Sequence, residues 1–240
     1  MTEYKPGSPH NLNYRDPGLT QAWQKLVAAP RRLWPKKPLD DPRDRAVLSL
    51  DRVVLTPPQP QDYRAWADTR RSSRDFLAPW EPAWPNDALS WAGYTKRITQ
   101  QCEDWNADRA YHFLIWRQAD PVLVGGMALT HIRRGVAQAG TLGYWLAADH
   151  TGQGLMTEAL LGVIDFAFAT LGLNRLEAAT MLTNQPSQRL LARAGFRQEG
   201  QAPDYLKIAG QWQDHWLYGL TRRQWSDQPG DAQQAEPDFI

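Results

Sequence analysis

Residues 150–172 read HTGQGLMTEALLGVIDFAFATLG, with two glycines one residue apart directly before a long apolar segment. The preceding stretch, TLGYWLA at residues 141–147, has the composition of a strand. Apolar residues recur at helical spacing from Met156 to Leu171, which predicts a helix. We therefore expect the chain to pass from strand to helix through a turn built on Gly152 and Gly154.

A turn of this kind can bind an anion. Glycine lets a ligand approach the backbone closely, and the first N–H groups of a helix are unpaired and lie at the positive end of its dipole. Residues 152–156 can therefore offer amides to a phosphorylated cofactor. The alternative is a plain tight turn, because a short glycine motif is a weak signal outside its structural context.

Composition narrows the class of protein. The 240 residues carry 27 Lys and Arg against 26 Asp and Glu, which argues against a dedicated nucleic-acid-binding domain. The single cysteine, Cys102, rules out an internal disulfide framework. No apolar run reaches the roughly 18 residues of a membrane span, and the first ten residues do not resemble a signal peptide. A cytoplasmic enzyme that does not enter a membrane is expected.

The two ends of the chain differ from its middle. Residues 1–47 hold seven of the 18 prolines, with nine basic and five acidic residues, and are predicted to be a basic arm. Within it RRLWPKK, residues 31–37, can contact a ribosome or RNA weakly, or serve as a solvated tether. Residues 226–240 carry four acids and no Lys or Arg, so we expect a disordered acidic tail. Residues 48–225 are expected to form one domain.

The predicted fold class of this domain is α/β, of the α+β kind, with a mixed and mostly antiparallel central sheet and helices on both faces. The expected order is β-α-α-β-β-β-α-β-α-β-β. A dinucleotide-binding fold would need its glycine turn after the first strand, and a Walker loop would need G-x-x-x-x-G-K-[ST]; neither is present. The predicted strands are 52–58, 111–117, 123–132, 141–147, 175–181, 196–200 and 214–221, and the predicted helices are 60–73, 87–105, 156–171 and 186–194.

Over residues 50–225 the sequence resembles the GNAT acyl-CoA transferases. The pyrophosphate turn of that family, Q/R-x-x-G-x-G/A, corresponds to residues 149–154, where both glycines match. Asp149 stands where a basic or amide residue is usual, so its side chain is expected to point away from the phosphates. Five further stretches resemble the RimJ/RimL-like ribosomal-protein-alanine N-acetyltransferase branch in order and spacing: FLAPWEP, RRGVAQAGTLGYW, GLMTEAL, NQPSQRLLARAGF and DYLKIAGQWQDH.

The resemblance implies acetyl-CoA as cosubstrate. No cluster of His and Cys has metal-ligand spacing, so no metal is expected. It places the pyrophosphate on the helix entrance and the pantetheine beside the strand at 143–147. A backbone N–H near Leu146 would stabilise the oxyanion. The implied cofactor-binding residues are Gly143, Tyr144, Trp145, Leu146, Gly152, Gln153, Gly154, Leu155, Met156, Thr157, Asn184 and Ser187.

The resemblance also implies catalytic roles. Ser187 would protonate the leaving thiolate, with an ordinary place in the first turn of its helix as the alternative. Asn184 would bind the pantetheine or cap that helix. Leu191 stands where many GNAT enzymes carry a tyrosine acid. Asp204 is the favoured base, with Glu81 and Glu177 as rivals and a turn aspartate as the alternative. Trp80, Glu81, Trp84 and Tyr205 are the acceptor-side candidates.

The expected function is transfer of an acetyl group to the N-terminal amine of a protein, a ribosomal protein with N-terminal alanine being the leading candidate. Two alternatives stay open: acetylation of a small amine such as an amino acid or an antibiotic, and a ribosome-associated binding factor without catalysis. The sequence leaves open the acceptor and the choice between monomer and homodimer.

Overall fold

The computed structural model describes residues 41–227, and the predictions for residues 1–40 and 228–240 lie outside this part of the chain. Its frame is one sheet in the order β1-β2-β3-β4-β5-β6-β8-β7, antiparallel except where β5 pairs with β6. The predicted fold class is confirmed. The strands are β1 (Leu48–Ser49), β2 (Val53–Thr56), β3 (Tyr111–Arg117), β4 (Leu123–Arg133), β5 (Ala139–Leu146), β6 (Arg175–Met181), β7 (Arg197–Ile208) and β8 (Gln211–Thr221).

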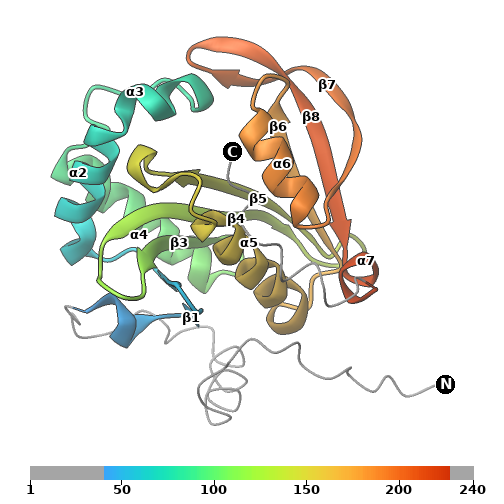
Figure 1. Ribbon diagram of the computed structural model, residues 1–240, viewed down its shortest axis with the longest axis horizontal. Helices are drawn as coiled ribbons and strands as arrows, with labels where there is room; N and C mark the ends of the chain where they lie inside the picture. The colour runs from blue at the N-terminus through green and yellow to red at the C-terminus, as the bar shows by residue number, and fades with distance from the viewer. Residues whose placement is uncertain (1–40, 228–240) are drawn as a thin grey trace.

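Helices and short helical turns connect these strands (Figure 1). The predicted helices are present, with a short extra helix between the first two predicted helices and another after the last strand. The α-helices are α2 (Tyr63–Ser72), α3 (Arg74–Leu77), α4 (Trp91–Asn106), α5 (Leu155–Asp165), α6 (Gln185–Arg193) and α7 (Arg222–Ser226). The 3-10 turns are η1 (Pro42–Arg45), η2 (Pro60–Asp62), η3 (Ala78–Trp80) and η4 (Ala148–His150), and η5 (Phe166–Thr170) is a π-helical turn that continues α5.

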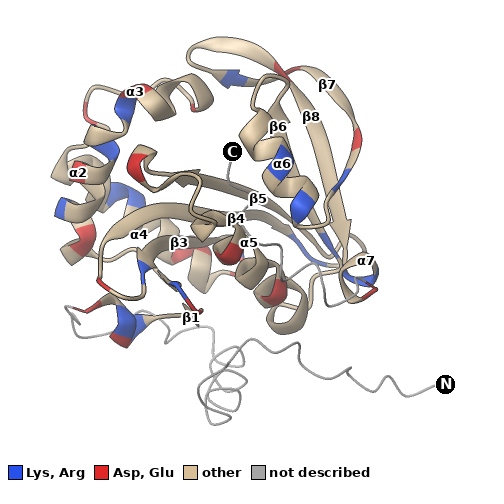
Figure 2. Ribbon diagram, in the orientation of Figure 1, with Lys and Arg blue, Asp and Glu red and all other residues tan. Residues whose placement is uncertain are grey.

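Alternation along the strands divides the core into two hydrophobic clusters, one on each face of the sheet. Val54 and Leu114 point to the face covered by α2 and α4, where they pack with Trp66 and Tyr94. The opposite faces of the same strands pack against α5, whose Leu160 is fully buried. Successive side chains of a strand point to opposite sides, so one short strand supplies both clusters. Figure 2 shows β5 without charged residues, as expected for a strand covered on both faces.

The last hairpin differs from the prediction. Strands were expected at 196–200 and 214–221, with Asp204 in the connecting turn, but β7 and β8 continue to a tight turn at Ala209 and Gly210. Both turn residues have positive φ, +48° and +84°, as a two-residue type I′ hairpin loop requires. Asp204 lies instead at a register shift within β7, with φ +46°. Pro203 and Asp204 thus mark a bulge, which such residues also favour.

The long hairpin reaches across the open end of the molecule toward α3 (Figure 1). Its tip is held there because the Ala209 N–H donates to the backbone carbonyl of Glu81 at 2.9 Å. The segment after η3 and the hairpin tip, more than 120 residues apart in sequence, are therefore neighbours. Among residues 41–227, no helix is both long and apolar enough to cross a membrane.

Candidate active site

The turn between β5 and α5 carries a row of unpaired amides. Gly152 and Gly154 both have positive φ, +71° and +73°, a backbone conformation that glycine adopts without steric cost. Within residues 41–227, the N–H groups of residues 152–157 donate no hydrogen bond to another part of the chain. Residues 151–154 are exposed. Free backbone N–H groups at the positive end of a helix are an arrangement that suits an anion.

Arg52 lies beside this turn as one half of an ion pair with Glu158, a contact that no sequence motif predicts. Its Nη1 donates to the Gln153 carbonyl at 3.0 Å, and its Nε to Glu158 Oε2 at 2.8 Å. About half of the arginine side chain stays exposed. A residue 101 positions away from its partner is found only when the fold is known.

The sheet opens next to this turn. β5 and β6 pair over only four residue pairs, from Ala139 opposite Arg175 to Leu142 opposite Ala178. β5 continues to Leu146 against β4, and β6 continues to Met181 against β8. The strands therefore share no pairing beyond Leu142, which leaves the last four residues of β5 with one open edge.

The open edge presents backbone groups. The Ala147 N–H donates to the Val124 carbonyl of the β4 segment. Because N–H groups alternate in direction along an antiparallel strand, the N–H groups of Tyr144 and Leu146 point away from β4, into the gap. Among the predicted cofactor residues, these two have backbone groups in position to pair with an extended ligand.

Two hydroxyl groups meet across the same gap. Tyr144 Oη lies 2.8 Å from Ser187 Oγ, which joins β5 to the first turn of α6. Asn184 is the N-cap of α6, and its Oδ1 accepts from the Ser187 N–H at 3.2 Å. Burial raises the pKa of Tyr144 to about 12, although the bond to Ser187 opposes the shift. The phenol is therefore protonated at neutral pH and can donate to Ser187.

The contact between the Tyr144 hydroxyl and Ser187 is not predicted by the sequence motifs, which imply only that Tyr144 lies beside the cofactor. Leu191, at the position for which the resemblance suggests a tyrosine acid, is fully buried in the core. The hydroxyl thus comes from β5 rather than from α6. An alternating strand does predict which face Tyr144 occupies, but the contact with Ser187 depends on how α6 packs.

The three acidic candidates have different environments. Glu177 pairs with Arg133 at 2.5 Å and Arg175 at 3.0 Å, in the paired part of the sheet. Asp204 is exposed, makes no ion pair within the described residues, and uses its N–H to donate to Asp214 at 2.9 Å. Of these three carboxylates, that of Asp204 is the least engaged.

Glu81, the third candidate, is closely held. Both of its oxygens accept from Arg70, at 2.7 and 2.5 Å, and Oε2 also accepts from Trp84 Nε1 at 2.8 Å. The Arg70 guanidinium lies over the Trp84 ring at 4.3 Å and over the Trp145 ring at 4.8 Å. Both oxygens of this carboxylate are therefore already engaged by side chains of the protein.

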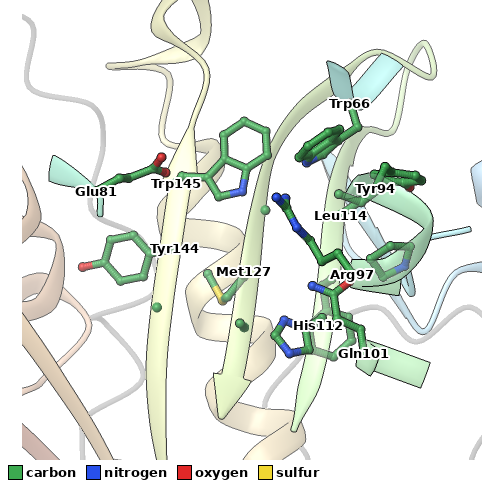
Figure 3. Close-up of a pocket in the computed structure, with 15 residues that line it drawn as sticks. Trp66, Glu81, Tyr94, Arg97, Gln101, His112, Leu114, Met127, Tyr144 and Trp145 are labelled. Atoms are coloured by element: carbon green, nitrogen blue, oxygen red, sulfur yellow. The ribbon is translucent and has the colours of Figure 1, made fainter. Parts of the chain in front are cut away.

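A cavity of about 260 Å³ lies between the sheet and the helices α2 and α4 (Figure 3). Its floor is a row across three strands in which His112 pairs with Ala128 and Ala128 with Gly143. Small residues keep this floor open, because an added Cβ on Gly143 would meet no atom within 4 Å. Since Gly143 is the first residue beyond the last β5–β6 pair, the cavity reaches the opening in the sheet.

The polar wall of the cavity comes from α4. Arg97 and Gln101 are one helical turn apart and both line it. The Arg97 guanidinium lies over the Trp66 ring at 4.6 Å, and Gln101 Oε1 is buried without a hydrogen-bond donor in the described residues. Burial lowers the pKa of His112, so its imidazole is neutral at neutral pH.

The predicted acceptor residues are only partly brought together. Glu81 lines the cavity and Trp84 holds Glu81, whereas Tyr205 lies on the hairpin with its ring 5.7 Å from that of His215. Trp80 is half-buried at the end of η3. Arg97, Gln101 and His112 were not predicted from the sequence; the one available signal was a histidine next to the apolar run at residues 113–116. In the described part of the chain, no three His, Cys, Asp or Glu side chains are grouped to hold a metal ion.

Comparison with known proteins identifies the architecture. The profile of the Acetyltransferase (GNAT) domain family matches residues 52–197. This chain belongs to the GNAT acetyltransferase family. It is therefore an N-acetyltransferase, and the family resemblance read from its motifs is confirmed.

Individual GNAT relatives cover most of this chain. The probable N-acetyltransferase YjcK of Bacillus subtilis is 37% identical over 168 residues, 70% of this chain and 93% of that protein. The [ribosomal protein uS5]-alanine N-acetyltransferase of Escherichia coli is 35% identical over 179 residues, 75% of this chain and 92% of that protein. The structure of Mycobacterium smegmatis RimJ in complex with CoA-disulfide is 30% identical with a TM-score of 0.71, covering 84% of this chain and 93% of that one.

Proposed function

We propose that this GNAT enzyme transfers the acetyl group of acetyl-CoA to the N-terminal α-amino group of a protein, with N-terminal alanine and a ribosomal protein as the leading acceptor. The observation that carries the proposal is the opened sheet, flanked by the free amides of residues 152–157 and by the Tyr144–Ser187 hydroxyl pair. The similarity to a uS5-alanine N-acetyltransferase supports the choice of acceptor. A protein of this function works in the cytoplasm.

The chain's own groups fit acetyl-CoA. The amides of Gly152, Gln153, Gly154, Leu155, Met156 and Thr157 would hold the pyrophosphate, with Arg52 beside them. The backbone groups of Tyr144 and Leu146 would pair with the extended pantetheine at the strand opening, next to Gly143 and Trp145. Asn184 would act through α6, whose N-terminus it caps.

Acetyl-CoA supplies an activated acyl group. The enzyme has to orient the acceptor amine toward the thioester and to protonate the leaving thiolate. A peptide α-amine has a pKa of about 7.7 to 8.0, so an appreciable fraction is neutral at cellular pH. As the nitrogen–carbon bond forms and the carbon–sulfur bond breaks, the amine loses a proton and the thiolate gains one. We assign delivery of the proton to the thiolate to Ser187, which Tyr144 then reprotonates. We assign stabilisation of the carbonyl oxygen to the Leu146 N–H.

The proton released by the amine needs an acceptor, and we keep Asp204 as the proposed base, because its carboxylate makes no ion pair in the described residues. On the acceptor side we propose Glu81, bonded to the hairpin tip, and Trp84, bonded to Glu81. Trp80 at the end of η3 and Tyr205 on β7 complete the proposed acceptor residues. The division into a basic arm at 1–47, an enzyme domain at 48–225 and an acidic tail at 226–240 remains part of the proposal.

The experiment is to incubate the enzyme with labelled acetyl-CoA, a cell lysate and a panel of N-terminal peptides, and to locate the label by mass spectrometry. Label on α-amines of proteins or peptides is the expected result. Label on lysine side chains or on small amines would overturn the proposed acceptor. Absence of transfer despite CoA binding would support the non-catalytic alternative instead.

A further inference from the structure

The cavity between the sheet and α4 contains an arginine without a counter-ion. Among its charged lining groups, Glu81 is neutralised by Arg70 through two hydrogen bonds. Arg97 makes no ion pair within residues 41–227, and His112 is neutral because burial lowers its pKa. Arg97 is therefore the one charged lining group that is left without an oppositely charged partner in the described residues, and it is also exposed to solvent.

Contact with an aromatic ring sets the direction of this charge. The Arg97 guanidinium lies over Trp66, and Trp66 is itself buried and packs against Tyr94 at 4.9 Å. A cation held over an indole face keeps a defined direction, and Figure 3 shows the Arg97 guanidinium directed toward Trp66 and Trp145. Its planar set of N–H donors matches a carboxylate.

We propose that Arg97 binds a carboxylate of the acceptor, an Asp or Glu side chain placed at the second or third residue of the acetylated protein. This inference rests on the proposed function and narrows its substrate class. An amine that binds near the Arg97 guanidinium does so in its neutral form, which is also the nucleophilic form. A negative side chain close behind it offsets the repulsion and fixes the register of the peptide.

The dimensions agree with this placement. From Gly143, beside the opening in the sheet, the floor runs across two strand spacings to His112, or roughly 10 Å. An extended peptide covers about 3.3 to 3.6 Å per residue, so an amine near Gly143 places its second or third side chain by α4. Gln101 Oε1, buried without a donor, is then available to accept a peptide N–H.

The test measures kcat/KM on peptides that begin with Ala and carry Asp, Asn or Lys at position 2 or 3. A charge-assisted pair to a partly exposed arginine should favour Asp over Asn by about tenfold, with Lys the poorest. Arg97→Gln should bring the Asp-to-Asn ratio close to one, and Arg97→Glu should reverse the order so that Lys becomes the best.

The control variant is Arg64→Gln, which removes an exposed arginine of α2 that does not line the cavity; it should keep the wild-type ratio. Thermal unfolding of each variant checks that it folds. Equal rates on all three peptides, or a ratio unchanged in Arg97→Gln, would overturn the inference while leaving N-terminal acetylation in place. Failure of the wild type to acetylate any peptide α-amine would instead refute the proposed function, and this inference with it.

Discussion

A double-mutant cycle on Tyr144 and Ser187 tests whether their hydroxyls act as one proton-donating unit. The changes are Tyr144→Phe, Ser187→Ala and both together. Each removes one side of a 2.8 Å hydrogen bond that joins β5 to α6. If protons reach the thiolate from Tyr144 through Ser187, each single change should slow kcat by about tenfold, or about 1.4 kcal/mol of barrier. The double variant should then be slowed by about tenfold as well, instead of a hundredfold.

The same cycle has a stability component that can be separated from catalysis. Leaving a buried hydroxyl without its partner should lower the free energy of unfolding by about 1 to 2 kcal/mol in each single variant. The two changes should couple by about 1 kcal/mol, because they share one bond. Denaturant unfolding gives these values, and thiol release from acetyl-CoA with a peptide acceptor gives kcat.

A matched control is Tyr111→Phe, which removes a tyrosine hydroxyl bonded to Asp108 at 2.7 Å on a different strand. It should lose stability without a tenfold loss of kcat. Multiplicative losses in the Tyr144 and Ser187 pair would show that the two hydroxyls act independently. A Tyr144→Phe variant that is less stable yet fully active would assign the pair to structure and refute the relay.

Three further outcomes are expected. Gly152→Ala should weaken CoA binding about tenfold by calorimetry, because an alanine at φ +71° is strained by roughly 1 to 2 kcal/mol although its Cβ meets no atom; unchanged affinity would remove this turn from the cofactor site. Arg45→Ala should cost about 3 to 5 kcal/mol of stability, because it leaves the buried Asp62 carboxylate unpaired, whereas Arg71→Ala, at an exposed pair, should cost less than about 1 kcal/mol in denaturant unfolding. Burial lowers the pKa of His112 in the folded state, so its contribution to stability is complete above pH of about 6.5 and is lost as pH falls. The free energy of unfolding of the wild type, relative to that of His112→Asn, should therefore decrease as pH falls below that value. A difference that does not depend on pH would contradict this expectation.

Much of the frame was predictable because it depends on local patterns. The strand–turn–helix passage at residues 141–171 follows from two glycines and a 3.6-residue apolar period, and both reappear as positive φ angles and a buried helix face. The last hairpin was underestimated for a local reason too. Pro203 and Asp204 are typical of turns and of bulges alike, and only the pairing with β8 decides between them.

The site was predictable where a motif covers contiguous residues and not where it is assembled from distant ones. Asn184 and Ser187 belong to one helix start, so their cap could be expected. The Tyr144 hydroxyl reaches Ser187 across 43 residues, and the cavity joins α4 to β3, β4 and β5. Such contacts depend on how the helices pack on the sheet, which no spacing in the sequence records. Arg97 in particular looks like any exposed helical arginine until its lack of a counter-ion is known.

The short ladder between β5 and β6 has a mechanical consequence. Within the sheet, only four residue pairs join β5 to β6, so this is the weakest line of strand pairing between its two halves. A pantetheine arm bonded to the free edge of β5 would add hydrogen bonds at this opening and would stabilise one half of the sheet against the other. The enzyme's resistance to unfolding and to proteolysis would then rise and fall with the acetyl-CoA supply of the cell, making the folded lifetime of the protein a readout of metabolic state.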